Sequence, residues 1–279
     1  MTGPCPHQHR AGSGEPLLLI HGIGSSWRIW KPLLPALEAR HEVLAISLPG
    51  FGASPPLDRK PTMPALADAV EAELDTAGMA SAHIAGNSLG GWIAAELARR
   101  GRVRSVVAIS PAGLWTPRER EYARRSLKAT RASTLRLAPH AERVTRSPVL
   151  RTQVFLQFAA RGWRVDPEEA AYAIRAYAGA PSFDATLEWM TSEGRVAEGL
   201  DRIESPFLVA WGTWDFLLPF RQAARWARIV PGAELRELPR LGHAPMSDDA
   251  ELLASTILDF TSRHARAEAA PRATTAIRS

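Results

Sequence analysis

The sequence predicts an α/β fold: a mostly parallel sheet with helices on both faces, interrupted by a helical cap insertion. Three observations carry this prediction. Short apolar runs bounded by glycine and proline alternate with stretches of helix length. One long segment in the middle of the chain has helical pattern only. Residues suited to nucleophilic chemistry follow directly after several of the apolar runs.

Six apolar runs are predicted to be strands. Short apolar runs bounded by glycine and proline are typical of strands that are buried on both faces of a parallel sheet. The runs span residues 17–20, 43–46, 82–86, 103–109, 207–211 and 233–238.

Five stretches between or after these runs have the periodicity of amphipathic helices. They span residues 27–39, 62–78, 89–101, 219–230 and 248–264. Alternation of strand and helix is typical of right-handed crossovers in an α/β sheet. We therefore expect residues 15–113 and 201–264 to form one core domain.

Residues 114–200 interrupt the alternation. They contain no convincing strand, and their helical pattern is broken at Pro139, Pro148, Pro167 and Pro181. This pattern predicts a helical cap inserted between the fourth and fifth runs. Outside the core, we expect residues 1–14 to be a loose N-terminal segment and residues 265–279 to be a disordered tail, because neither shows periodicity.

The composition excludes several classes of protein. Hydrophobic residues make up 46% and charged residues 23% of the chain, as in ordinary soluble domains. No apolar run reaches the roughly 18 residues that a membrane span needs, and the first residues lack the pattern of a signal peptide. The single cysteine excludes an internal disulfide and a cysteine-based metal site. We expect a cytoplasmic protein.

The basic residues concentrate in one segment. Residues 117–164 contain 12 Lys and Arg residues and 3 Asp and Glu residues, whereas the rest of the chain is net acidic. We interpret this segment as the solvated face of a cap helix. The alternative is a surface that attracts anionic substrates or a membrane. A nucleic-acid partner is not expected, because its binding face would spread the charge and include aromatic residues.

The strongest local motif surrounds Ser88, in the sequence Gly-Asn-Ser-Leu-Gly-Gly at 86–91. It lies between a predicted strand and a predicted helix. A sharp strand-to-helix turn requires small neighbours, which Gly86 and Gly90 provide, and it would expose the Ser88 hydroxyl as a nucleophile. The simpler alternative is a serine that caps the helix.

Two backbone amides could bind the negative oxygen of a tetrahedral intermediate. The amide of Leu89 would lie at a helix N-terminus, where free N–H groups favour negative charge. The amide of Ile23, in the sequence His-Gly-Ile-Gly at 21–24, could complete an oxyanion hole, unless this is an ordinary loop. We expect His21 to fix the loop rather than to take part in catalysis.

Asp215 and His243 each follow a predicted strand, in the sequences Trp-Gly-Thr-Trp-Asp and Leu-Gly-His-Ala-Pro. Carboxyl ends of parallel strands meet at one edge of a sheet, where ligands bind. A serine, an acid and a histidine in this chain order, each after a different strand, form the layout of a Ser-His-acid site. Asp248 and Asp249 are the alternative acids.

These motifs together resemble the α/β-hydrolase fold superfamily, in its serine-hydrolase branch, over residues 15–264. The motifs that carry the resemblance are HGIGSSWRIW, LPGFGAS, GNSLGG, WGTWD and LGHAPMSDD. The resemblance implies Ser88 as nucleophile, His243 as general base and Asp215 as its orienting acid. It also implies an oxyanion hole from the Ile23 and Leu89 amides and a cap domain over about 114–200.

Three departures from the family pattern bear on the function. The N-terminal hairpin common in the family is hard to see in residues 1–15, and Ser47 stands where many relatives have aspartate. Relatives that hydrolyse carbon–carbon bonds share the GNS-x-GG motif but usually carry tryptophan after the catalytic histidine, where this chain has Ala244. Serine at position 88 argues against dehalogenase and epoxide-hydrolase chemistry, which in this family use a carboxylate nucleophile.

The resulting hypothesis is a carboxylic-ester hydrolase that acts on small to medium apolar substrates and needs no metal or organic cofactor. The alternatives are a carbon–carbon bond or lactone hydrolase on the same triad, and a hydrolase-fold binding protein with negligible turnover. Aromatic residues in or beside the candidate loops and cap are expected to line an apolar substrate pocket. They are Trp27, Phe51, Trp115, Trp189, Trp214 and Phe216.

Overall fold

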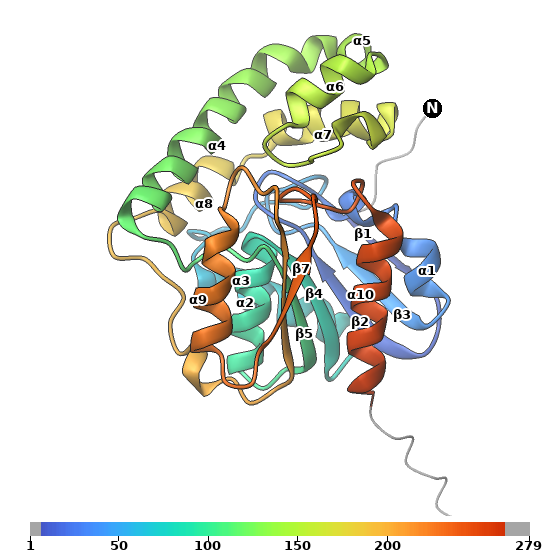
Figure 1. Cartoon of the computed structure of the whole chain (residues 1–279), viewed down its shortest axis with the longest axis vertical. Helices are drawn as coiled ribbons and strands as arrows, with labels where there is room; N and C mark the ends of the chain where they lie inside the picture. The colour runs from blue at the N-terminus through green and yellow to red at the C-terminus, as the bar shows by residue number, and fades with distance from the viewer. Residues whose placement is uncertain (1–6, 266–279) are drawn as a thin grey trace, which may run out of the picture.

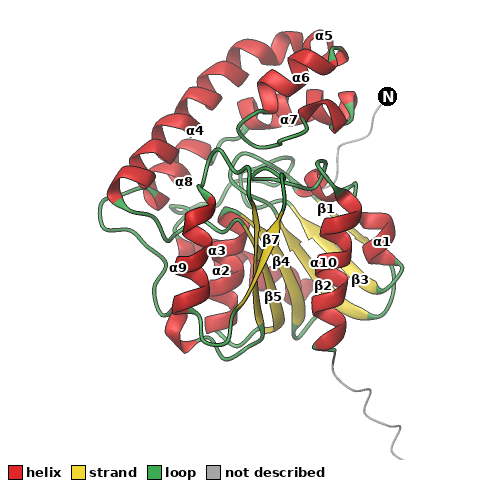
Figure 2. Cartoon of the chain, in the orientation of Figure 1, coloured by secondary structure: helices red, strands yellow, loops and turns green. Residues whose placement is uncertain are grey.

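A computed structural model of the protein describes residues 7–265, and its centre is a seven-stranded sheet (Figure 2). The strands are β1 (Gln8–Ala11), β2 (Glu15–Ile20), β3 (His41–Ile46), β4 (Ala82–Asn87), β5 (Val103–Ile109), β6 (Phe207–Gly212) and β7 (Glu234–Leu238). Their order across the sheet is β1-β3-β2-β4-β5-β6-β7. All neighbouring strands are parallel except β1 and β3. The predicted α/β fold with a mostly parallel sheet is confirmed.

Strand β1 corrects one prediction. Residues 8–11, which we expected within a loose N-terminal segment over 1–14, pair antiparallel with β3 and form one edge of the sheet. The strand has four residues, and none of its side chains is fully buried. An edge strand of this kind carries no apolar run that could mark it in the sequence. Residues 1–6 lie outside the described part of the chain.

Helices cover both faces of the sheet (Figure 1). On one face, side chains of α2 (Met63–Thr76), α3 (Leu89–Arg99) and α9 (Ala223–Ile229) belong to one buried cluster that also contains Leu18 and Ile20 of β2. On the other face, side chains of α1 (Leu34–Glu38) and α10 (Ala250–Arg263) share a second buried cluster with Leu17 and Leu19. These two leucines alternate along β2 with Leu18 and Ile20. Single turns of 3-10 helix precede two of these helices: η1 (Trp27–Trp30) and η5 (Phe220–Gln222).

The segment that we expected to form the cap is helical and lies over the carboxyl ends of the strands (Figure 1). Its helices are α4 (Pro117–Leu137), α5 (Ala141–Arg146), α6 (Pro148–Phe155), α7 (Pro167–Gly179) and α8 (Phe183–Met190), with the single turns η2 (Ala138–His140), η3 (Gly162–Arg164) and η4 (Leu200–Arg202). Pro148 and Pro167 begin helices, where the missing N–H of proline costs no hydrogen bond.

Ion pairs hold the start of the cap on the core. Glu119 is buried, reaches back to the backbone N–H of Thr116 in a capping box, and also binds Arg221 and Arg225 near α9 at 2.7 Å each. Within residues 7–265, no helix combines the length and the apolar character that crossing a membrane requires. Of the predicted tail over 265–279, all but Ala265 lies outside the described residues.

Candidate active site

Ser88 occupies a sharp turn between β4 and α3. Its backbone has φ 57° and ψ −114°, a conformation that L residues adopt only under strain. The turn is possible because the adjacent backbones pass without side chains between them. A Cβ atom on Gly86 would overlap the carbonyl of Gly90, and one on Gly90 would overlap the carbonyl of Ile20. The two glycines that the sequence places around Ser88 are therefore required by packing.

His243 and Asp215 form a buried pair after β7 and β6. Asp215 Oδ2 lies 2.8 Å from His243 Nδ1, and both side chains are almost fully buried. The other oxygen, Oδ1, accepts hydrogen bonds from the amides of Leu217 and Leu218 at 2.9 and 2.7 Å. These bonds hold the carboxylate in place beside Nδ1 of the imidazole. Because Nδ1 is hydrogen-bonded to Asp215, Nε2 is the ring nitrogen that can accept or donate a proton at the cavity.

Asn87 connects the serine turn to the histidine loop. Its Nδ2 atom donates to the carbonyl of His243 at 2.9 Å and to the carbonyl of Ile109 at 3.1 Å. The side chain next to Ser88 thus holds the backbone of His243 in place. Sequence reasoning did not assign this role to Asn87, although the residue stands in the motif that identified Ser88.

The loop after β2 places the amide of Ile23 at the same edge of the sheet. Gly22 to Ser25 form a tight turn, in which the Ser25 amide donates to the Gly22 carbonyl at 3.2 Å and Gly24 has φ 77°. Leu89 is the first residue of α3, so its amide has no acceptor within the helix. The geometry is compatible with an oxyanion hole between these two amides.

His21 is fully buried beneath this loop. Its Nδ1 lies 2.7 Å from the Gly22 carbonyl, and its Nε2 accepts the amide of Leu48 at 2.9 Å. Burial lowers the pKa of His21 to about 4, although the bond to Gly22 acts in the opposite direction. A neutral imidazole with both nitrogens bonded to backbone is a structural element of the loop.

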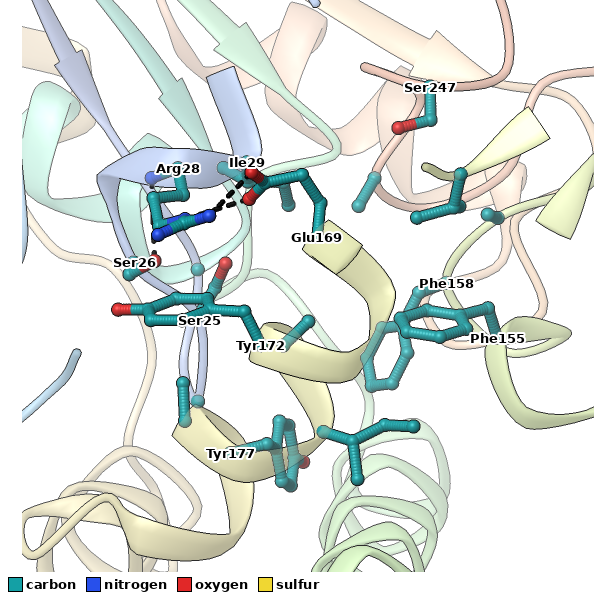
Figure 3. A pocket seen from close by; sticks show the side chains of 18 of the residues that line it. Ser25, Ser26, Arg28, Ile29, Phe155, Phe158, Glu169, Tyr172, Tyr177 and Ser247 are labelled. Carbon is teal, nitrogen blue, oxygen red and sulfur yellow. Dashed lines mark hydrogen bonds and ion pairs between the residues drawn. The ribbon is translucent and has the colours of Figure 1, made fainter. Parts of the chain in front are cut away.

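A cavity of about 440 Å³ connects the serine turn to the cap. Ser88, Ile23 and His243 line its base, and Phe158 and Tyr177 of the cap segment contribute aromatic rings (Figure 3). Other lining side chains are mostly apolar and include Ile29, Val154, Phe155, Val165, Ala173, Ile174, Leu217 and Ala244. Ser88 and His243 therefore share one apolar cavity, which is closed on one side by the cap.

Charged groups occupy one part of the cavity wall (Figure 3). Glu169 of α7 accepts hydrogen bonds from Arg28 Nε at 2.8 Å and from Lys31 Nζ at 2.5 Å. Burial alone would raise the pKa of Glu169, but the bonds from Arg28 and Lys31 outweigh it and lower the pKa. These ion pairs connect the cap to the loop that carries Ile23.

The six aromatic residues predicted to contact substrate are all described by the structure, and none of them lines the cavity. Phe51 is fully buried in the core, with its ring against His21. Trp27, the first residue of η1, is buried and stacks on His9 with ring centroids 5.2 Å apart. These two rings fill the core domain, so the prediction is corrected for both.

The prediction of a substrate contact is also corrected for the four remaining aromatic residues. Trp115 and Trp189 pack on Trp92 of α3, with centroids 6.0 and 5.7 Å apart, and fill the junction between cap and core. Trp214 and Phe216 are about half exposed, at 48% and 51%. Cavity-lining rings come instead from Phe155, Phe158, Tyr172 and Tyr177. No local motif marks these positions, because the path of the cap helices over the core decides which rings face the cavity.

No cluster of three or more histidine, cysteine or acidic side chains suited to a metal ion occurs between residues 7 and 265. Arg164 lines the cavity, but it is exposed, and its Nη1 donates to the backbone carbonyl of Asp248 at 2.8 Å.

Comparisons with known proteins agree with this architecture. The chain is 29% identical to the dihydrolipoyllysine-residue acetyltransferase component of an acetoin cleaving system from Pseudomonas putida, over 94% of this chain and 70% of that protein. It is 32% identical to a pimeloyl-[acyl-carrier protein] methyl ester esterase of Aromatoleum aromaticum, over 87% of this chain and 96% of the relative. Other similar proteins are named as an epoxide hydrolase, a meta-cleavage product hydrolase and an enol-lactonase.

Among solved structures, a thermophilic esterase from Thermogutta terrifontis superposes with a TM-score of 0.72 at 24% identity, covering 92% of this chain and 93% of that one. A model of the family described as "Alpha/beta hydrolase family" matches residues 17–256. The mostly parallel sheet with helices is the one expected from the resemblance. The chain belongs to the alpha/beta hydrolase family.

Proposed function

We propose that this protein is a serine hydrolase that cleaves carboxylic esters of small to medium apolar substrates through an acyl-enzyme on Ser88. The observation that carries the proposal is the common cavity: the strained serine and the Asp215-bound histidine both line one apolar space. A serine that served only as a helix cap would not need this conformation, and its side chain makes no capping hydrogen bond to α3.

In the first half-reaction, Ser88 Oγ attacks the ester carbonyl carbon while His243 Nε2 takes the hydroxyl proton. Asp215 holds the imidazole in the tautomer with the proton on Nδ1 and stabilises the imidazolium that forms. The amides of Ile23 and Leu89 receive the developing negative oxygen. His243 then gives its proton to the departing alkoxide, so that the alcohol leaves and the acyl group stays on Ser88.

In the second half-reaction, a water molecule loses a proton to His243 and attacks the acyl carbon. The tetrahedral intermediate collapses, the carboxylic acid leaves, and Ser88 recovers its proton from His243. No step requires a metal ion or an organic cofactor.

The shape and lining of the cavity support the substrate class. A volume of about 440 Å³ lies within the ordinary range for small-molecule sites, roughly 300–1,000 Å³. Phe155, Phe158 and Ile174 offer apolar surface to an acyl or alcohol chain. The carboxylate of Glu169 neutralises one of the two positive charges that Arg28 and Lys31 bring to the cavity wall. The similarity to an esterase over most of both chains is consistent with this class of bond.

Carbon–carbon bond cleavage is the alternative that uses the same triad. It would need a cationic side chain inside the cavity to hold the carboxylate of a dienol substrate. The segment 114–200 offers three candidates for this role, Arg161, Arg164 and Arg175. Arg161 and Arg175 do not line the cavity, and Arg164 lines it but is exposed and donates to the backbone carbonyl of Asp248. Arg28 and Lys31 also line the cavity, but both are paired with Glu169. We therefore favour ester cleavage over the carbon–carbon reaction.

The deciding experiment compares substrates and labels the nucleophile. We expect hydrolysis of p-nitrophenyl esters, with a kcat/KM that varies with acyl length, and little cleavage of a vinylogous 1,5-diketone acid. A fluorophosphonate probe should attach to Ser88, as read by peptide mass mapping. A higher kcat/KM for the diketone acid would favour the carbon–carbon reaction. Absence of both turnover and labelling would favour a binding protein.

A further inference from the structure

The histidine loop is attached to the cap by a carboxylate that the mechanism above does not use. Asp248 is fully buried and accepts three backbone hydrogen bonds. Its Oδ2 accepts the amides of Gly242 at 2.7 Å and Ala160 at 2.9 Å, and its Oδ1 accepts the amide of Arg161 at 2.7 Å. Its side chain therefore binds two segments that are about eighty residues apart in sequence.

Both segments border the candidate active site. Gly242 directly precedes His243, and Ala160 follows Phe158 and Ala159, which line the cavity. A further bond joins them without Asp248, since the amide of Ala244 donates to the carbonyl of Phe158 at 2.7 Å. The Phe158 ring lies 6.4 Å from the His243 ring, centroid to centroid.

The two backbones are in direct contact at Gly242. A Cβ atom at this position would lie 2.7 Å from the Phe158 carbonyl oxygen and 2.7 Å from the Ala160 nitrogen, closer than side chains tolerate. On its other side, the backbone at Gly242 packs against Gly212 at the end of β6. The end of β6, the histidine loop and the cap segment are thus stacked without intervening side chains. The carboxylate of Asp248 accepts hydrogen bonds from the amides that this stacking buries.

A second contact between the cap and the core, at Glu169, is held differently. There, Glu169 of α7 contacts Arg28 and Lys31 through side chains that are 22–37% exposed. Such solvent-accessible ion pairs stabilise little, whereas hydrogen bonds to a buried carboxylate are strong and costly to lose. The attachment of the cap beside His243 is therefore firmer than its attachment at Glu169.

We propose that Asp248 is a positioning residue for the hydrolytic reaction, which attaches cap residues 158–161 to the loop that carries His243. The imidazole of His243 and the ring of Phe158 in the cavity wall then stay at a fixed distance and orientation. The inference rests on the proposed function of Ser88, His243 and Asp215. Asp248 itself does not touch the imidazole, which is bound by Asp215.

The test compares Asp248→Asn with Asp249→Asn. The neighbouring Asp249 caps α10 through the amide of Leu252 and lies 3.6 Å from Arg161, so it controls for loss of a charge at the same place. An asparagine at position 248 retains one acceptor oxygen but turns an NH₂ group toward amides that need an acceptor. Both variants are assayed with p-nitrophenyl acetate and p-nitrophenyl octanoate, and active sites are counted by titration with the fluorophosphonate probe.

We expect kcat per titrated site to fall roughly 10- to 100-fold for both esters in Asp248→Asn, because a small displacement of the base is costly. KM should rise for the octanoate, which reaches the Phe158 wall, but not for the acetate. Asp249→Asn should stay within about 3-fold of the wild type in both constants. A merely structural loss would lower the number of titrated sites and leave these constants unchanged.

Hydrogen exchange supplies the second measurement. In Asp248→Asn, peptides covering residues 156–164 and 240–246 should lose protection together, while in Asp249→Asn neither should. Asp248→Ser, which leaves room for a water molecule between the amides, replaces Asp248→Asn if that variant folds poorly. Unchanged kinetic constants per titrated site in an active enzyme overturn this inference alone. A wild type without ester turnover and without labelling at Ser88 overturns the proposed function and the inference together.

Discussion

Two sets of serine, histidine and carboxylate lie at opposite ends of the same sheet. At the carboxyl ends of the strands are Ser88, His243 and Asp215. At the amino ends, His83 of β4 lies 2.7 Å from the hydroxyl of Ser105 on β5 through Nδ1, and 3.1 Å from the carboxylate of Glu15 on β2 through Nε2. By residue type and hydrogen bonding alone, the second set also has the composition of a catalytic triad.

The surroundings of the two serines differ in every respect that matters for catalysis. Ser105 lies within strand β5 and is fully buried, as is His83, and neither of these described residues lines the cavity. Glu15 also binds Arg104 at 2.7 Å. Ser88, in contrast, stands in a strained turn at a cavity, beside a helix N-terminus. A reactive serine is therefore defined by access and by nearby amide donors, and not by its histidine and acid alone.

Replacing each serine by alanine gives the largest expected contrast. Ser88→Ala should lower kcat/KM for ester hydrolysis by about 10⁴-fold or more, because it removes the nucleophile. Ser105→Ala should leave kcat/KM within about 3-fold of the wild type and instead lower the free energy of unfolding by about 1–3 kcal/mol, because the Nδ1 of buried His83 loses its partner. Steady-state kinetics and urea unfolding measure the two effects.

Comparable loss of turnover in both serine variants would show that the amino-terminal set is also part of the reaction, and would break the comparison. The fluorophosphonate probe provides a control on accessibility, since it should label Ser88 and not Ser105 in the wild type.

Neutralising each acid gives the next largest contrast. Asp215→Asn should lower kcat by about 10³- to 10⁴-fold, because an amide NH₂ facing Nδ1 favours the wrong imidazole tautomer. Glu15→Gln should change kcat by less than about 2-fold, since it weakens contacts with Arg104 and His83 that lie far from the cavity lining. Stopped or continuous p-nitrophenol release measures both. Wild-type turnover in Asp215→Asn would contradict the assignment of the orienting acid.

The smallest effect concerns the pH dependence of stability. Burial lowers the pKa of His83 and of His41 from 6.5, despite opposing contacts with Glu15. The ring of His41 lies 5.7 Å from that of His83 and is bonded to the Glu15 carbonyl and to Thr261, and Arg104 further disfavours their protonation. The folded protein therefore keeps both imidazoles neutral at pH values where the unfolded chain protonates them.

The contribution of these two histidines to the free energy of unfolding is therefore complete above pH 6.5. It decreases as the pH falls toward their folded-state pKa values. Each histidine contributes a slope of up to about 1.4 kcal/mol per pH unit. Melting temperatures between pH 7.5 and 5 should fall less steeply in His83→Gln than in the wild type, with His21 contributing equally to both proteins. Parallel curves would mean that the amino-terminal histidines do not respond to acid.

The sequence by itself determined the sheet, most of its strands and which serine, histidine and acid are candidates for the active site. Runs such as 17–20 and 106–109 are continuously apolar because both faces of these strands are covered, and this property is visible without coordinates. Gly86 and Gly90 mark the turn at Ser88 because no other residue fits between the crossing backbones. Asp215 and His243 could be placed because each directly follows a strand of a parallel sheet.

Tertiary structure alone decided what surrounds these residues. Strand β1 is paired at an edge and half-buried, so its residues carry no distinctive pattern. The aromatic residues divide between core and cavity according to the path of the cap: Trp115 packs on the core, whereas Phe158 faces His243. Asp248 acquires its partners only when residues 160–161 reach it from the cap. Such contacts join distant parts of the chain, and the local sequence does not encode which segments will meet.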